Sequence, residues 1–292
     1  MNLEAIIQTF KPDVKKSSIA TYIHALKRVA PDKKIENLDF LKDTDAVIAK
    51  INELPLNTGR STVSAILVSL LASGNKNDDV YQIYKLKSDE LFKAMIALNS
   101  QNKKTPKEEE NWVKHSVLLK IAESMIKNAP GSQRSLIAAL YTYQPPTRLD
   151  YYDMEIIGKD AVLDDKKNYL RITNRSKKEF IFQDYKNVKS RGQVIIPVNK
   201  QINSVINKYM KLNPDIKYLL SNERKMSEPM SRNSLGKTIP KIFESTGKHI
   251  TLNMIRHILA SENINLEEEK KKKELADAMM HSSATQLNYA KH

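Results

Sequence analysis

The stretch from Tyr169 to Val198 reads YLRITNRSKKEFIFQDYKNVKSRGQVIIPV, and it decides the fold class. Three short segments within it, 169–173, 179–182 and 193–198, are rich in β-branched and aromatic residues. Polar turns separate these segments. We expect three short strands that form a small antiparallel sheet.

The segments on both sides of this stretch have helical patterns. Apolar residues recur at helical spacing in 17–29, 61–71 and 79–98. Further helices are expected at 112–128, 133–143, 200–212, 231–245, 251–263 and 272–280, with a short one at the end of the chain. The fold class is therefore mainly α. An all-helical domain at 1–100 precedes a mostly helical domain with the small sheet at 112–292, and the polar segment 101–111 is a charged linker.

Composition excludes several function classes. The chain has 292 residues, with 48 Lys+Arg against 34 Asp+Glu, a net charge of +14 and no cysteine. Disulfides, thiolate zinc sites and cysteine nucleophiles are thereby excluded. No glycine-rich phosphate loop or metal-ligand histidine spacing is present, so we expect no nucleotide, cofactor or metal. No apolar run is long enough to cross a membrane. The charge points to a nucleic-acid partner. The absence of cysteine fits a reducing compartment, so we expect an intracellular protein.

Three motifs occur in an order that suits chemistry on a DNA backbone. The first, QPPTRLD at 144–150, places Arg148 after two prolines. The second, TLNMIRH at 251–257, carries Arg256 and His257 at the start of an apolar helix. The third, HSSATQLNY at 281–289, places Tyr289 eight residues after His281.

This ordered set resembles the tyrosine recombinases, the family of phage integrases and chromosome-dimer resolvases. The resemblance implies a helical DNA-clamping domain at 1–100 and a catalytic domain at 112–292. It also implies a catalytic set that consists of Arg148, Lys186, Arg256, His281 and Tyr289. Lys189, Lys177 and Lys178 compete with Lys186 for the role of the hairpin lysine.

The resemblance further implies the reaction and its partners. Tyr289 would attack a backbone phosphate of double-stranded DNA and form a 3′-phosphotyrosyl link without a cofactor. Family members act as homotetramers on DNA, and the reaction would integrate or excise a mobile or viral element. The protein would then work in the cytoplasm or nucleus of its host, wherever its target DNA lies.

Two departures from the family pattern leave alternatives open. Thr147, rather than Arg148, lies three residues before the acidic Asp150, and Asn253 stands where the family's HxxR box has histidine. One alternative is a non-catalytic DNA-binding protein on a degenerate recombinase scaffold. Another is a type IB topoisomerase-like enzyme, which shares the chemistry but works as a monomer.

Basic residues also cluster outside the motifs. A face of this kind would contact phosphates without reading bases. The candidate DNA-binding residues lie around the first long helix and in the linker, and they are Lys15, Lys16, Lys27, Arg28, Lys103 and Lys104.

Overall fold

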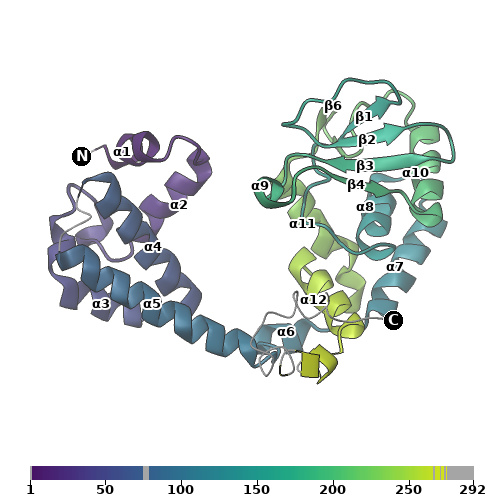
Figure 1. Ribbon diagram of the computed structural model, residues 1–292. Coiled ribbons are helices and arrows are strands. Elements are labelled where there is room, and N and C mark those ends of the chain that lie inside the picture. The colour runs from purple at the N-terminus through teal and green to yellow at the C-terminus, as the bar shows by residue number, and fades with distance from the viewer. Residues whose placement is uncertain (1, 75–78, 266, 270, 273, 275–292) are drawn as a thin grey trace. The chain divides into compact units, whose positions relative to one another are not determined.

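The computed structural model describes residues 2–74, 79–265, 267–269, 271–272 and 274 (Figure 1). The chain divides into two compact units, Met1–Lys103 and Lys104–His292. Each unit has a hydrophobic core of its own.

The first unit is entirely helical in its described residues. Its α-helices are α1 (Leu3–Phe10), α2 (Lys16–Leu26), α3 (Thr44–Asn52), α4 (Leu56–Ala72) and α5 (Asp79–Ser100). Helices α2, α4 and α5 confirm the predictions at 17–29, 61–71 and 79–98. Helix α4 packs against both α2 and α5, and it buries Val63, Ile66 and Leu70. The sequence patterns missed α1 and α3, which are short and whose first turns are capped by Asn2 and Asp43.

The second unit is mostly helical. Its helices are α6 (Pro106–Asn111), α7 (His115–Asn128), α8 (Gln133–Thr142), α9 (Val188–Arg191), α10 (Lys200–Leu212), α11 (Arg232–Ile242) and α12 (Leu252–Asn263). Helix α8 is central, because it packs against α7, α10 and α11 and is buried from Ser135 to Thr142. Among the described residues of the chain, no helix is both long and apolar enough to span a membrane.

The sheet of the second unit has four strands in the order β1-β2-β3-β4. They are β1 (Glu155–Gly158), β2 (Tyr169–Ile172), β3 (Lys178–Phe182) and β4 (Val194–Pro197). The three predicted strands are β2, β3 and β4, and they pair antiparallel as expected. The expectation of a three-stranded sheet was wrong, because β1 pairs parallel to β2 along one edge. Its pairing with β2 and a bridge from Glu155 to Tyr218 on its other side define it.

A small hairpin was also missed by the sequence patterns. It consists of β5 (Ser221–Asn222) and β6 (Lys225–Pro229). Its strands are short and polar, so they lack the alternation that identifies a strand from sequence. The hairpin precedes α11 and brings two of its turn residues to that helix.

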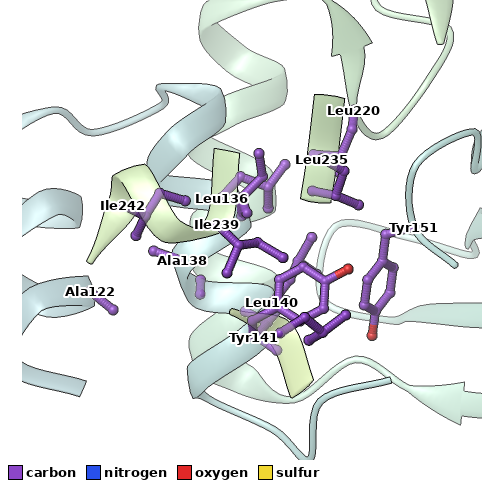
Figure 2. Packing of buried hydrophobic residues seen from close by; sticks show 14 of the residues in the cluster. Ala122, Leu136, Ala138, Leu140, Tyr141, Tyr151, Leu220, Leu235, Ile239 and Ile242 are labelled. Carbon is purple, nitrogen blue, oxygen red and sulfur yellow. The ribbon is translucent and has the colours of Figure 1, made fainter. Parts of the chain in front are cut away.

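The core of the second unit joins α8 to the sheet through aromatic rings. Figure 2 shows the rings of Tyr141 and Tyr151 beside each other, among side chains that include Leu140, Leu235 and Ile239. The rings of Tyr141 and Tyr151 meet edge to face at 5.7 Å, and Tyr151 meets Phe180 of β3 at 5.1 Å. Edge-to-face pairs of this kind add about 1 kcal/mol each beyond burial. The segment between Tyr141 and Tyr151 is therefore anchored at both ends.

The polar segment expected to be a linker contains a helix in its second half. Thr105 and Glu108 form a capping box at the start of α6, and Pro106 occupies its first turn. The Asn111 side chain at the end of α6 accepts a hydrogen bond from the backbone N–H of His249 at 2.7 Å. The bond to His249 holds the end of α6 against the segment that precedes α12.

Candidate functional site

Arg148 lies in the loop that follows α8, which we call the arginine loop (143–150). The hydroxyl of the buried Tyr141 donates a hydrogen bond to the backbone carbonyl of Arg148 at 3.2 Å. The Thr147 hydroxyl donates to the same carbonyl at 3.1 Å, and the Gln144 side chain donates to the Tyr151 hydroxyl. Because Pro145 and Pro146 also restrict the backbone, the position of Arg148 is well defined.

Asp150 connects the arginine loop to a second arginine. This carboxyl is only 6% exposed, and burial raises its pKa above the usual range. The positive charges of Arg232 and then Arg148 oppose that rise in pKa. Arg232 begins α11, and the sequence patterns did not single it out, because only tertiary packing brings α11 to α8. The arginine loop thus contains a carboxyl near two guanidinium groups.

Lys186 and Lys189 lie in the connection between β3 and β4, which we call the lysine loop (183–193). Both side chains are exposed, and Lys189 is part of the short helix α9. Two hydrogen bonds cross the loop: the Tyr185 hydroxyl donates to the carbonyl of Gly192 at 2.8 Å, and the Gln193 amide donates to the Gln183 side chain. The expected hairpin lysines are therefore carried by a braced loop.

Lys178 has a different environment from the other candidate lysines. It is 3% exposed, and its Nζ donates to the Arg175 carbonyl at 2.8 Å and to the side-chain oxygens of Asn203 and Asn207 at 2.7 Å each. Burial, followed by the nearby charge of Arg175, lowers the pKa of Lys178. All three of its N–H groups are used, so Lys178 holds the β2–β3 turn against α10.

Arg256 lies on α12 and lines a pocket of about 640 Å³. The pocket is also lined by Thr142–Pro146, so Arg256 shares it with the first part of the arginine loop. Arg148 itself is not one of the lining residues. Asn253, one turn before Arg256, is exposed, and the side chain of His257 is 60% exposed with its Nε2 3.8 Å from Glu108 Oε1 of α6.

The two remaining residues of the expected catalytic set, His281 and Tyr289, lie outside the described residues. The helices expected at 272–280 and at the end of the chain also fall largely or wholly outside them. Within the described part of the chain, the structure relates Arg256 to the arginine loop through the shared pocket, and it places Lys186 and Lys189 together on the lysine loop.

The expected DNA-binding residues are all exposed. Lys15 and Lys16 lie at the start of α2, and Lys27 and Arg28 follow its end. Lys103 ends the first unit, and Lys104 begins the second. The Nζ of Lys104 stands 4.1 Å from the centroid of the Trp112 ring, which orients that side chain by a cation–π contact.

A basic pocket of about 420 Å³ lies between the β5–β6 hairpin and α11. Arg224 from the hairpin and Lys237 and Lys241 from α11 line it, so its three cations outnumber the one carboxylate, Glu223; Ser231 and Ser234 also line it. The sequence reasoning missed this pocket. The spacing of Lys237 and Lys241, four residues apart on one helix face, was the available signal.

In the part of the chain that the structure describes, no group of three or more His, Cys, Asp or Glu side chains is arranged to hold a metal ion. The acidic residues near the arginine loop are accompanied by guanidinium groups instead.

Comparison with known proteins finds similarity in structure but not in sequence families. No protein-family model matches the chain, and no curated protein matches it. Among solved structures, the chain is similar to the crystal structure of XerA recombinase. The two are 10% identical with a TM-score of 0.37, over 89% of this chain and 82% of that one.

Proposed function

We propose that this protein is a tyrosine-type DNA strand transferase, a site-specific recombinase or integrase that cleaves and rejoins double-stranded DNA. The observation that carries the proposal is the ordered set of Arg148, a hairpin lysine, Arg256, His281 and Tyr289. In the described residues, this order coincides with a braced arginine loop, a braced lysine loop and a helix that begins shortly before Arg256.

The proposed reaction begins at Tyr289. Its phenolic oxygen forms a bond to phosphorus and loses its proton to solvent, while the bond from phosphorus to the 5′ oxygen breaks. A lysine gives its proton to that 5′ oxygen. The 5′-hydroxyl of a second strand then attacks the 3′-phosphotyrosyl ester, which restores the phosphodiester and releases Tyr289. The bond energy is kept in the ester, so no nucleotide is consumed.

The remaining residues act on the charge of the phosphate. Arg148 and Arg256 are proposed to donate hydrogen bonds to the non-bridging oxygens, which carry extra negative charge in the transition state. Each such donor contributes about 3 kcal/mol by comparison with other oxyanion sites. His281 is proposed to hydrogen-bond the same phosphate.

The proton donor is proposed to be Lys186 or Lys189. Lys178 is excluded from this role, because its ammonium group donates all its protons to protein oxygens. The three remaining candidates are all exposed: Lys186 and Lys189 lie on the lysine loop, and Lys177 lies in the β2–β3 turn. Single Lys186→Ala, Lys189→Ala and Lys177→Ala variants separate them, because the variant that lacks the proton donor loses cleavage.

The first unit, 1–103, is proposed to be a core-DNA-binding domain. Its exposed cations at both ends of α2 and Lys103 would contact phosphates, and so would Lys104 at the start of the second unit. As in the family that the chain resembles, we propose a homotetramer on DNA and a role in the integration or excision of a mobile or viral element.

The decisive experiment measures a covalent protein–DNA adduct. The probe is a duplex library with a randomised central region and a nick that traps the cleaved product. The expected result is an adduct that survives SDS, that is lost in Tyr289→Phe and that is retained in the control Tyr218→Phe. If the wild-type protein binds these duplexes and forms no adduct, the proposed activity is wrong and a non-catalytic DNA-binding protein replaces it.

A second measurement separates recombinase from topoisomerase chemistry. Supercoiled plasmid of arbitrary sequence is incubated with the protein at concentrations where it is monomeric. A recombinase requires its own sites and leaves such plasmid supercoiled. Efficient relaxation by the monomer would replace the recombinase assignment with a type IB topoisomerase-like one.

A further inference from the structure

A single buried amide joins the two loops that carry the candidate catalytic side chains. Asn168 immediately precedes β2 and is 2% exposed. Its Nδ2 donates to the carbonyl of Asp150 at 3.2 Å and to the carbonyl of Asp184 at 2.9 Å. Its Oδ1 accepts from the backbone N–H groups of Gln183 at 2.8 Å and Asp184 at 3.0 Å.

These four bonds use the full hydrogen-bonding capacity of the amide. They also fix its orientation, because both partners of Nδ2 are carbonyl oxygens and both partners of Oδ1 are N–H groups. No other residue type of this size supplies two donors and two acceptors in one plane. The identity of residue 168 is therefore specified by its surroundings.

The partners of Asn168 belong to separate loops. Asp150 is the last residue of the arginine loop, two positions after Arg148. Gln183 and Asp184 begin the lysine loop. Asp184 lies two positions before Lys186 and five before Lys189. The β2–β3 ladder ends at the pair Tyr169 and Ile181, so the Asn168 side chain supplies contacts where the strand pairing stops.

We infer that Asn168 is a positioning residue, which holds the arginine loop and the lysine loop at a fixed separation so that both act on one phosphate. This inference rests on the proposed function. A guanidinium that stabilises the non-bridging oxygens and a lysine that protonates the 5′ oxygen must reach the same phosphorus centre. A displacement of about 1 Å in such a pair costs about a hundredfold in rate.

A sulfur-substituted DNA substrate tests whether the lysine loop is correctly placed for proton donation. In a duplex with a bridging 5′-phosphorothiolate, the leaving group is a thiolate, which departs without protonation by a general acid. A variant with a displaced lysine loop is therefore slow on the phosphodiester and less affected on the phosphorothiolate. The measured quantity is the ratio of the two adduct-formation rates.

The test variants are Asn168→Ala, which removes all four bonds, and Asn168→Asp, which keeps the shape and the acceptor oxygens but loses both donors. We expect adduct formation on the phosphodiester to fall about tenfold to a hundredfold in Asn168→Ala. We also expect the ratio of phosphorothiolate to phosphodiester rates to rise. Asn168→Asp provides the test if the alanine variant does not fold: its rate falls because the bond to the arginine loop is lost.

The matched control is Asn213→Ala. The Asn213 amide donates to the carbonyls of Gly131 at 3.3 Å and Tyr209 at 2.9 Å and touches neither loop. This variant loses stability without a change in the rate ratio. A folded Asn168→Ala or Asn168→Asp protein with wild-type rates and a wild-type ratio would overturn the inference.

A second readout does not depend on activity. Hydrogen exchange of the segments 147–152 and 183–190 is expected to accelerate together in Asn168→Ala and to stay unchanged in Asn213→Ala. If the wild-type protein forms no adduct but this joint acceleration occurs, the proposed function fails while the link between the loops stands. If exchange in the two segments does not change, the link itself is wrong.

Discussion

The hydroxyl group of Tyr141 donates a hydrogen bond to the carbonyl oxygen of Arg148 at 3.2 Å, and this bond connects the buried end of α8 to the arginine loop. The Tyr141 ring is fully buried. A phenylalanine at this position keeps the packing contacts of the ring and loses only the hydroxyl. We expect Tyr141→Phe to lower the free energy of unfolding by about 1 kcal/mol and to reduce DNA cleavage. Urea unfolding and adduct formation are the measurements.

Tyr209→Phe is the control for this prediction. The Tyr209 hydroxyl is also buried and donates to the Gln133 side chain at 3.1 Å, away from Arg148. The Tyr209→Phe variant should lose a similar amount of stability and leave DNA cleavage unchanged. Equal cleavage defects in the two variants would contradict a specific role of Tyr141.

Asp150 provides a prediction about pH. Because burial raises its pKa, the folded protein binds this proton more tightly than the unfolded chain does. The stability contributed by Asp150 is therefore present below the unfolded pKa of 3.8 and lost as pH rises through the higher folded pKa. We expect the stability of wild type relative to Asp150→Asn to increase as the pH falls through the raised folded pKa toward 3.8.

Urea unfolding at a series of pH values measures this difference. Asp165→Asn, which removes an exposed carboxylate between β1 and β2, is the control for the loss of one charge. A difference between wild type and Asp150→Asn that is constant with pH would show that the Asp150 carboxyl is not perturbed.

Lys178 is expected to be a structural residue. Lys178→Met keeps the length of the side chain but leaves the oxygens of Arg175, Asn203 and Asn207 without their donor. We expect a loss of about 3 kcal/mol in the free energy of unfolding. The exposed neighbour Lys177 is the control, and Lys177→Met should change stability by less than about 0.5 kcal/mol. Similar small effects in both variants would contradict the assignment.

The basic residues after α2 are expected to contact DNA phosphates. The double variant Lys27→Gln and Arg28→Gln should weaken binding and reduce the slope of log affinity against log salt by about 2. Titration of a random-sequence duplex at several salt concentrations measures this slope. The control is Lys85→Gln, since Lys85 is paired with Asp89 at 3.0 Å. A slope that stays unchanged in the double variant excludes these two contacts.

The sequence by itself determined the class of fold. Long helices such as α4 and α10 have apolar stripes that are legible without a structure, and strands β2 to β4 are rich in β-branched and aromatic residues between polar turns. Short elements such as β1 and the β5–β6 hairpin were not predictable, because pairing with a neighbouring strand defines them.

The candidate site also has a part that was predictable from sequence and a part that was not. The types and order of Arg148, Lys186, Arg256, His281 and Tyr289 were legible because the chemistry that they resemble requires them in that order. Only the tertiary structure decided that Lys178 is committed to Asn203 and Asn207, that Arg232 approaches Asp150, and that Asn168 joins two loops. These contacts link residues 16 to 82 positions apart. Only the folded structure determines them. Burying a polar group without a partner costs free energy, and the packing of the core decides which partners lie within reach.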